Sequence, residues 1–393
     1  MARQRKQSPR HRIVRSSPAC PLLYAASDAN ADQLYFGRFF APDAYLSLGP
    51  RGQRVAVMNS LEYGRALKES EYDTVLRLEE WQNRARKTFK RKDAGLAHIV
   101  KLLAHEYGVR RFVVPPDFPA GFLAKLRALQ IPVTVNDGPL FPERAIKNRE
   151  ETACIREGCE ACAAGLYAAE RALRRSTAKR NGELYLNGEA LTSERLRFLV
   201  DVACMENGAI AQNTIVAGGL QACDPHCRGS GPLRASDLII VDVFPRVTET
   251  GYFGDMTRTF LKGRATEPQR ALVAAVRRAQ KIALKKLGPG VTGKKVHQSV
   301  QKYFAKLGYE TCRKPTHYEG FFHGTGHGVG LEIHEPPRVG LTGVGRLRKG
   351  MVVTVEPGLY YPGLGGCRIE DVVQITDDGC KLLSDYDYDW ELP

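Results

Sequence analysis

The stretch HGTGHGVGLEIH, residues 323–334, decides how the chain is interpreted, because it carries three of the nine histidines. His323 and His327 stand four positions apart, a spacing that would place both on one face of a helix. Alternating glycines disfavour a helix and let backbone pass close to a ligand: Gly324, Gly326, Gly328 and Gly330. We therefore expect an irregular or extended segment that presents imidazoles to a cavity. The alternative is a glycine-rich surface loop with incidental histidines, and the rest of the chain decides between them.

Four acidic residues elsewhere occupy positions where a charge is costly. Each lies within or at the end of an apolar, strand-like run: Asp242, Asp255, Glu356 and Glu370. A buried carboxylate must be paired, hydrogen-bonded or bound to a metal. One such acid is usually structural, but four beside a histidine-rich segment would repel one another unless cations balanced them. Oxygen ligands with one imidazole suit Mn²⁺, Co²⁺ or Zn²⁺, and two such ions can hold a hydroxide and polarise a carbonyl.

All of these residues except Asp242 occur in four blocks: GYFGDMTRTF (251–260), HGTGHGVGLEIHEPP (323–337), VVTVEPGLYYP (352–362) and GCRIEDVV (366–373). Their order resembles that of the dinuclear metallopeptidases of the pita-bread fold, and most closely the aminopeptidase P and prolidase branch, the Xaa-Pro peptidases. The resemblance covers about residues 148–393 and is weaker before them. It implies five ligands for two divalent metal ions, most often Mn²⁺, with Co²⁺ or Zn²⁺ as alternatives: Asp242, Asp255, His327, Glu356 and Glu370.

The resemblance also implies roles for the residues around the ligands. Glu356 would be the general base that takes a proton from the nucleophilic water, so that a metal-bridging hydroxide attacks the peptide bond. His226 and His334 would stabilise the tetrahedral intermediate or hold the substrate. His323 would line the pocket for proline, and Arg368 would support the site from its position close to the last ligand.

One spacing departs from the family pattern. Asp242 and Asp255 lie thirteen positions apart, two more than is usual, and Asp242-Val-Phe-Pro lacks the glycine that normally follows the first aspartate. We expect residues 247–260 to form the second strand of a hairpin after a turn near Thr248–Gly251. Because side chains alternate along a strand, an even insertion keeps both carboxylates on one face. Asp237 is an alternative first ligand, but its spacing agrees less well with the GYFGD block.

The first part of the chain is predicted to be a separate, smaller domain. Short apolar runs alternate there with helical segments, which is typical of an α/β unit with a largely parallel sheet. We expect strands at 55–58, 112–115 and 131–135, and helices at 94–107 and 118–129. The proline-containing stretch 137–151 predicts a boundary. Residues 21–145 would then form a domain that resembles the creatinase and prolidase amino-terminal domain, and residues 148–393 the α+β pita-bread catalytic domain.

The second part of the chain carries clear helix-capping signals. Thr192, Thr266 and Thr292 each precede a helical pattern, and Pro268 is tolerated in a first turn. We expect helices at 150–173, 193–206, 267–287 and 293–307, and strands at 237–244, 351–358 and 367–376. Cys159 and Cys162 lie on the first of these helices. They could begin a zinc site, but the only other close pair is Cys223 and Cys227, so buried core thiols are the preferred interpretation.

Composition limits the classes of function. Ten cysteines in 393 residues are too few for a disulfide scaffold, so we expect reduced thiols in a cytoplasm. No apolar run is long enough for a membrane helix.

The net charge of +15 includes two clusters of positive residues. Six positive residues lie within 1–16, in an arm of residues 1–20 that we expect to be disordered, and a second cluster lies at 84–92. Neither cluster accompanies a nucleic-acid motif, so we expect no dedicated nucleic-acid role. The acid-free arm is also compatible with an organelle transit peptide.

The preferred functional hypothesis is hydrolysis of an Xaa-Pro bond in a dipeptide or at the amino terminus of a longer peptide. Proline removes the N–H and fixes φ, so such bonds need a dedicated site. A methionine aminopeptidase is disfavoured by the extra amino-terminal domain and the GCRIED block. A metal-free creatinase-like hydrolase, or a non-catalytic peptide-binding module on the same scaffold, would typically have lost ligands. The resemblance implies a homodimer, and the sequence leaves the length of the peptide open.

Overall fold

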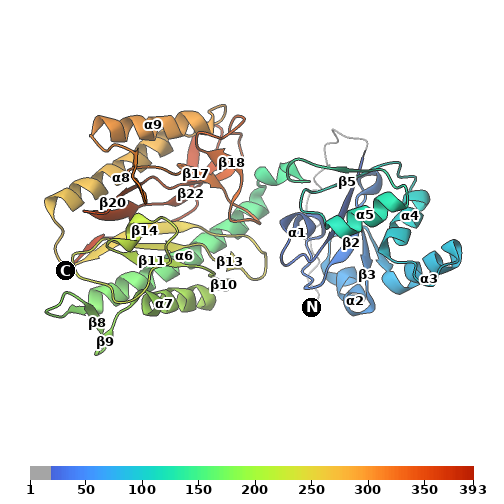
Figure 1. The fold of residues 1–393 in the computed structure, drawn as a ribbon, viewed down its shortest axis with the longest axis horizontal. Helices are drawn as coiled ribbons and strands as arrows, with labels where there is room; N and C mark the ends of the chain where they lie inside the picture. The colour runs from blue at the N-terminus through green and yellow to red at the C-terminus, as the bar shows by residue number, and fades with distance from the viewer. Residues whose placement is uncertain (1–18) are drawn as a thin grey trace, which may run out of the picture. The chain divides into compact units, whose positions relative to one another are not determined.

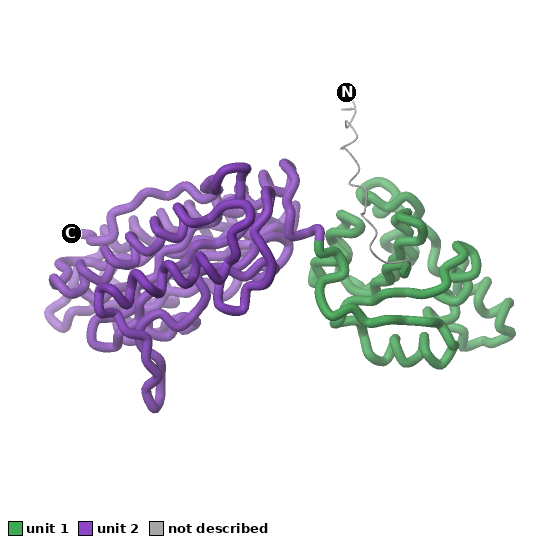
Figure 2. The backbone as a smooth tube through the Cα atoms, turned by 90° about the horizontal axis from the view of Figure 1, so that it is seen from above, with its two compact units in different colours: residues 1–142 green, residues 143–393 purple. Residues whose placement is uncertain are grey.

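The computed structural model describes residues 19–393. The predicted basic arm of residues 1–20 therefore lies almost wholly outside the described residues. The chain divides into two compact units, unit 1 ending at Pro142 and unit 2 spanning Glu143–Pro393 (Figure 2). Within the described part of the chain, no helix is both long and apolar enough to span a membrane.

Unit 1 is built on a six-stranded sheet in the order β4-β3-β2-β1-β5-β6 (Figure 1). Its strands are β1 (Cys20–Ala25), β2 (Tyr45–Leu48), β3 (Val55–Met58), β4 (Thr74–Arg77), β5 (Phe112–Val114) and β6 (Val133–Val135). The pairs β3–β4, β1–β5 and β5–β6 are parallel, whereas β2 is antiparallel to β1 and β3. The expected largely parallel sheet is confirmed, with β2 as its exception.

Helices pack against this sheet and close its core. They are α1 (Ala31–Gly37), α2 (Ser60–Glu69), α3 (Leu78–Phe89), α4 (Leu96–Glu106) and α5 (Ala120–Ala128), with a short 3₁₀ turn, η1 (Pro50–Gly52). Leu22, Val57 and Val100 are among the fully buried side chains between the layers. The predicted strand at 55–58 is β3, and the predicted helix at 94–107 is α4, shorter at both ends.

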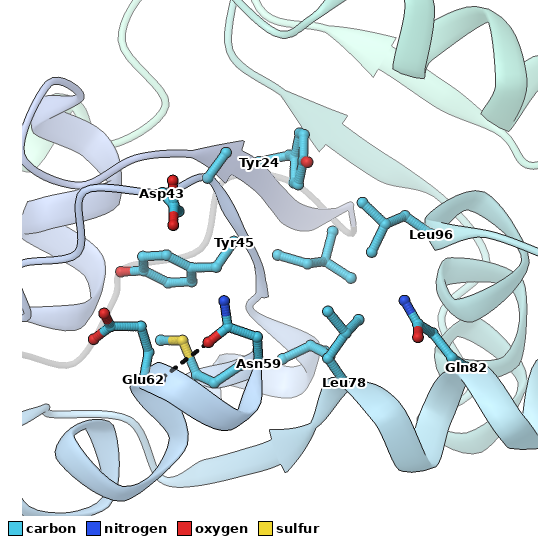
Figure 3. A pocket seen from close by; sticks show the side chains of 12 residues that line it. Tyr24, Asp43, Tyr45, Asn59, Glu62, Leu78, Gln82 and Leu96 are labelled. Carbon is cyan, nitrogen blue, oxygen red and sulfur yellow. Dashed lines mark hydrogen bonds between the residues drawn. The ribbon is translucent and has the colours of Figure 1, made fainter.

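A small cavity of about 130 Å³ lies at the edge of this sheet where β3 and β4 end (Figure 3). Leu78 and Leu96 contribute apolar surface to it, and Asp43 and Glu62 contribute carboxylates. The side-chain oxygen of Asn59 accepts a hydrogen bond from the backbone N–H of Glu62 and caps α2. The cavity contains none of the residues that the sequence predicts for catalysis.

Unit 2 alternates long helices with many short strands. The helices are α6 (Arg149–Arg175), α7 (Ser193–Glu206), α8 (Glu267–Lys286) and α9 (Gly293–Lys306), with the 3₁₀ turns η2 (Pro142–Ala145) and η3 (Gln221–Cys223). The strands are β7 (Thr177–Ala178), β8 (Leu184–Leu186), β9 (Glu189–Ala190), β10 (Ala209–Ile210), β11 (Ile215–Gly218), β12 (Ile239–Val243), β13 (Arg246–Val247), β14 (Met256–Lys262), β15 (Cys312–Arg313), β16 (Tyr318–Glu319), β17 (Gly326–Gly328), β18 (Glu335–Val339), β19 (Val352–Val355), β20 (Gly358–Tyr361), β21 (Gly365–Arg368), β22 (Asp371–Ile375), β23 (Cys380–Leu382) and β24 (Glu391–Leu392).

Two sheets carry most of unit 2, in the orders β11-β12-β14-β24 and β18-β17-β19-β22-β23. Figure 1 shows α8 and α9 on one side of the strands and α6 and α7 on the other. One apolar core joins α8 and α9 to β19 and β22, and another joins α6 and α7 to β12 and β14. The predicted helix caps are confirmed, since Thr192, Thr266 and Thr292 each accept a backbone N–H from three residues on.

The two predicted strands that contain glutamates are each broken in the structure, which corrects the expectation of continuous strands at 351–358 and 367–376. β19 ends before Glu356-Pro357, and β20 begins after them in a different, two-stranded sheet with β21. β21 ends at Arg368, and β22 begins just after Glu370. Pro357 has no N–H to donate to a ladder, and the N–H of Glu370 bonds instead to the carbonyl of Thr257 at 3.0 Å. Both glutamates therefore lie where the chain changes sheets.

Helix α6 approaches the turn before β14 closely enough to require glycine on both sides. A Cβ atom on Gly158 would lie 2.3 Å from the nitrogen of Gly254, and one on Gly254 would lie 2.1 Å from the carbonyl carbon of Gly158. Backbone therefore packs directly on backbone at this crossing. Because Gly254 immediately precedes Asp255, the crossing fixes the position of a predicted ligand.

Candidate metal centre

The predicted site residues meet in unit 2 around a single cavity of about 920 Å³. All nine line it: His226, Asp242, Asp255, His323, His327, His334, Glu356, Arg368 and Glu370. They come from separate strands and connecting segments that are distant in sequence. The glycine-rich stretch is therefore part of a cavity wall and not a surface loop with incidental histidines.

The two aspartates come from one antiparallel pair of strands, Asp242 within β12 and Asp255 just before β14. Asp242 lies on β12 directly opposite Thr257 on β14. Residues directly opposite one another point to the same face, and so do residues two positions apart on one strand. The expected second strand over residues 247–260 is corrected, because β14 begins only at Met256 and Asp255 lies just before it. Asp255 nevertheless lines the same cavity as Asp242 despite the longer spacing. Pairing of β10 with β13 accommodates part of the intervening chain.

Three of the predicted ligands form a tight, buried cluster. One ligand atom from each of Asp255, His327 and Glu370 lies within 4.8 Å of the other two. Nε2 of His327 is 3.6 Å from a carboxylate oxygen of Asp255 and 3.5 Å from one of Glu356. Its Nδ1 lies 3.2 Å from the carbonyl of Gly328, which leaves Nε2 directed at the acids.

Asp242 lies apart from this cluster and is engaged by an arginine. One of its oxygens accepts a hydrogen bond of 2.7 Å from Arg368, and the pair is buried. Its other oxygen, Oδ1, is buried and has no hydrogen-bond partner among the described residues. A buried carboxylate oxygen without a partner is costly, and Asp242 lines the cavity, so this oxygen is suited to bind a cation there.

Asp255, Glu370 and the neighbouring Glu356 hold protons unusually tightly because they are buried and close together. Burial and the charge of Glu370 raise the pKa of both Asp255 and Glu356 well above the usual range. Burial and the charge of Asp242 raise the pKa of Glu370 to about 7, although a 2.7 Å hydrogen bond from the Thr257 hydroxyl acts the other way. Burial lowers the pKa of His327 to about 3, so its imidazole is neutral.

A divalent cation fits this set of residues. Carboxylate oxygens with one neutral imidazole nitrogen are ligands that Mn²⁺, Co²⁺ and Zn²⁺ accept. Burial and mutual repulsion raise the pKa values of these acids even though Arg368 lies nearby, and a cation would favour their ionised forms. The unpartnered Oδ1 of Asp242 offers a further ligand atom at the same wall.

His323 belongs to a polar chain beside the cluster. Its Nε2 lies 2.8 Å from the hydroxyl of Tyr360, which accepts a 3.0 Å hydrogen bond from Arg368. Burial, with the charge of Arg368, lowers the pKa of His323 to about 3. The ring of His323 also packs against Phe322 and Tyr360, with centroids 6.3 Å and 5.4 Å away. This part of the cavity is therefore aromatic with a neutral imidazole at its edge.

His226 and His334 occupy more solvent-accessible positions on the same cavity. The ring of His334 packs edge-on against His327, with centroids 4.4 Å apart. Burial, with the charge of Arg338, lowers the pKa of His334. Arg338 also lines the cavity, and no hydrogen bond or ion pair within the described chain engages its guanidinium.

A match to the family of metallopeptidases known as M24 covers residues 153–377. The chain belongs to metallopeptidase family M24. It is 31% identical over 280 residues to the Xaa-Pro dipeptidase of Pyrococcus horikoshii, a match that spans 70% of this chain and 74% of that protein. The solved prolidase of Pyrococcus furiosus has 25% identity and a TM-score of 0.74, over 94% of this chain and 97% of that one.

The pita-bread fold of this metallopeptidase, and its place in the aminopeptidase P and prolidase branch, are thereby confirmed. The X-Pro aminopeptidase of Thermotoga maritima shares the fold with a TM-score of 0.78 at 22% identity, over 95% of this chain and 97% of that one. Both comparison structures extend across both units of this chain. The two-domain arrangement is therefore common to them.

Sequence reasoning missed several residues that shape the site of this metallopeptidase. Tyr360 joins His323 to Arg368, and Thr257 binds the carboxylate of Glu370. Tyr360 lies within one of the four sequence blocks, but the sequence does not show which of the adjacent residues Tyr360 and Tyr361 faces the site. Thr257 carried a usable signal, because a residue two positions from an aspartate on a strand shares its face.

Proposed function

We propose that this metallopeptidase hydrolyses the Xaa-Pro bond of dipeptides. The observation that carries the proposal is the meeting of Asp255, His327 and Glu370 in one buried cluster, with Asp242 and Glu356 on the same cavity. The Xaa-Pro dipeptidase and the prolidase to which the chain is similar support the choice of substrate.

The proposed metal ligands of two divalent ions are Asp242, Asp255, His327, Glu356 and Glu370. Such ions would act as Lewis acids and would lower the pKa of water. Mn²⁺ is the proposed metal, with Co²⁺ and Zn²⁺ as alternatives. Arg368 holds Asp242 at 2.7 Å, so we propose that this arginine orients the aspartate and limits its charge.

Glu356 is the proposed general base. Its side chain is the most exposed of the four acids, at 17% against 11% for Asp242, and one of its oxygens lies 3.5 Å from Nε2 of His327. Burial and Glu370 raise the pKa of Glu356, and a carboxylate of higher pKa is the stronger base once a cation has favoured its ionised form. A water in the cavity can therefore transfer its proton to Glu356, while the more deeply buried acids keep their places.

Each of the remaining residues is proposed to contact a different part of the substrate. The aromatic wall of Phe322 and Tyr360, edged by the neutral His323, suits the apolar proline ring. His226 and His334 are proposed to hold the substrate carbonyl and stabilise its developing negative charge. Arg338, which has no partner within the described chain, is a cation available for the terminal carboxylate of a dipeptide.

The decisive experiment measures turnover of Ala-Pro and Gly-Pro against Ala-Pro-Ala in the presence of Mn²⁺, Co²⁺ or Zn²⁺. We expect release of proline from the dipeptides, and a preference for them over the tripeptide that falls in Arg338→Met. A protein without bound metal and without metal-dependent cleavage of any of these peptides would contradict the proposal, and would favour a non-catalytic peptide-binding role.

We also propose a homodimer, on the family resemblance, and a reducing compartment such as the cytoplasm, because ten cysteines in 393 residues are too few for a disulfide scaffold. Light scattering in the presence of Mn²⁺ tests the first proposal. Fractionation of the source cells tests the second.

A further inference from the structure

A buried group of charges lies at the beginning of unit 2, outside the proposed ligand set. Lys147 forms an ion pair with one oxygen of Glu335, and Arg144 binds the other at 2.9 Å. The side chains of Lys147, Glu335 and Arg144 are only 1%, 3% and 7% exposed. The same nitrogen of Arg144 also binds Glu332 at 2.8 Å. Charges buried this deeply persist only when they are paired.

The segment that carries these cations is itself fixed in place. The N–H of Lys147 bonds to the carbonyl of Gly350 at 2.8 Å, and Ile146 forms a β-bridge with Met351. A Cβ atom on Gly350 would lie 2.8 Å from the side chain of Ile146, so the contact is close. Residues 144–147 are therefore held on the chain just before β19, the strand that leads to Glu356.

The two acids that Arg144 binds stand on either side of His334 in the sequence. Glu335 begins β18 and pairs with Gly328 on β17, and its carboxylate lies against Gly330, where a Cβ would be 2.5 Å away. Glu332 lies within the turn between the strands and is half exposed. Arg144 thus joins the turn to the start of the strand, and Ile333 and His334 lie between its two partners in the sequence.

The position of His334 depends on this support of its backbone, because its own side chain makes few contacts. Within the described residues no hydrogen bond reaches its ring, and its aromatic contact is the edge of His327. The position of the imidazole therefore follows from the backbone of its turn. That backbone is held through Glu332 and Glu335.

We propose that Arg144 is a positioning residue for His334, holding the turn of residues 329–335 so that the imidazole faces the cavity. Lys147 balances the charge of Glu335 and leaves Arg144 able to hold both acids. The catalytic role of His334 in this inference rests on the proposed function. The effect of Arg144 on the position of the His334 ring does not, and it can be measured in an inactive protein.

The test is a double-mutant cycle on the metal-loaded enzyme. Arg144→Met leaves Glu335 paired with Lys147, so the fold has a reason to tolerate it. We expect kcat with Ala-Pro to fall about tenfold, since small misplacements of a catalytic group are costly, with metal content unchanged. In a His334→Ala background the same substitution should cost less than about twofold, because the group it positions is gone.

Two further variants and a control keep the test decisive if Arg144→Met folds poorly. Arg144→Lys, which keeps one ion pair, and Glu332→Gln, which removes the exposed partner, should each give a smaller loss that also disappears with His334→Ala. Arg270→Met removes an arginine that pairs with Glu391 and Glu267 away from the cavity, and should change neither kcat nor KM. An equal loss from Arg144→Met in both backgrounds, or no loss at all, would overturn the proposal.

A readout without activity separates this inference from the proposed function. In protein labelled with ¹³C-histidine, the His334 ring signal, assigned by its absence in His334→Ala, should shift in Arg144→Met and stay unchanged in Arg270→Met. An unmoved signal would overturn the proposal even in an active enzyme. A shifted signal in an enzyme that cleaves no Xaa-Pro peptide would support the positioning role and refute the proposed function.

Discussion

Asp255 and Glu356 are both carboxylates on the same cavity, but their surroundings differ. Asp255 belongs to the tight cluster with His327 and Glu370, whereas Glu356 stands at its open side. We predict that Asp255→Asn loses most bound metal, and that Glu356→Gln keeps more of it. Both should lose at least about 10²-fold in kcat, because one lacks metal and the other lacks its base.

Elemental analysis of the two purified variants, beside turnover of Ala-Pro, checks this prediction. Gln and Asn each remove a charge and keep the shape of the side chain, so each variant controls for the other. Equal loss of metal from both would show that Glu356 is chiefly a ligand and would remove the argument for it as the base.

The cysteines of α6 provide a second prediction at the scale of residues. Burial raises the pKa of Cys159 to about 12 and that of Cys162 well above its ordinary value. Because the thiolate is the reactive form, only about one part in 10⁴ of Cys159 is reactive at pH 8. We expect iodoacetamide to modify the partly exposed Cys227 and Cys312 of the native protein and to spare Cys159 and Cys162.

Mass spectrometry after digestion measures this labelling, and denatured protein is the control in which every cysteine reacts. A raised pKa keeps the thiol protonated as the pH increases, so the protection should extend to about pH 10. Rapid labelling of Cys159 in the native protein would contradict the buried-thiol interpretation.

The four proposed acidic ligands could be singled out because each is a charged residue within or beside an apolar run, a local signal, whereas the full ligand set with His327 followed from the family resemblance. Their partners could not be predicted in this way. Arg144 and Glu335 are far apart in the sequence, and each looks like an ordinary surface charge until the fold buries them together. The ion pair between Arg368 and Asp242 could not be predicted either, since both residues were expected at the site but not as partners.

At the scale of elements, the contact between α6 and the turn before β14 predicts that a glycine-to-alanine substitution is destabilising there, although it is tolerated in an open helix. Gly158→Ala would place a methyl group against backbone that has no flexible atom to move. We expect it to lower the free energy of unfolding by about 2–3 kcal/mol. It should also weaken metal binding, because Gly254 directly precedes Asp255.

Gly64→Ala is the matched control. Gly64 lies within α2 of unit 1, and a Cβ there would meet nothing within 4 Å. The same change should raise the stability of that unit by about 0.5–1 kcal/mol, since alanine favours a helix. Urea denaturation followed by circular dichroism measures both variants. Equal effects from the two substitutions would refute the close packing of α6.

Helices were easier to predict than strands, for a physical reason. A helix is marked by local features, and the capping residues Asn148, Thr192, Thr266 and Thr292 lie where each helix begins. A strand is completed by partners elsewhere in the chain. The breaks at Glu356 and Glu370 depend on which sheet each half joins, so an apolar run with one embedded acid looks continuous in the sequence.

At the scale of the whole molecule, we expect metal removal to affect the two units unequally. The four proposed acidic ligands all belong to unit 2, and without cations their charges repel one another. A metal present at about 1,000 times its dissociation constant would contribute about 4 kcal/mol. Chelation should therefore lower the melting temperature of unit 2 by on the order of 10 °C.

Differential scanning calorimetry before and after dialysis against a chelator checks this expectation. Unit 1, which has its own apolar core and none of the proposed ligands, should melt at the same temperature in both samples. Restored Mn²⁺ should restore the first profile together with the activity. An unchanged scan of unit 2 would argue that the cluster does not bind metal.

The hairpin of β20 and β21 joins Glu356 to Glu370, and its register pairs Gly358 with Arg368 and Tyr361 with Gly365. The distance between the two glutamates is therefore set at the open end of the hairpin, by pairing that does not involve its tip at residues 362–364. Extra residues inserted at that tip would lengthen the connection without moving either acid. The spacing of Glu356 and Glu370 therefore does not depend on the length of the tip, so additional residues can be introduced there with little effect on the proposed metal centre.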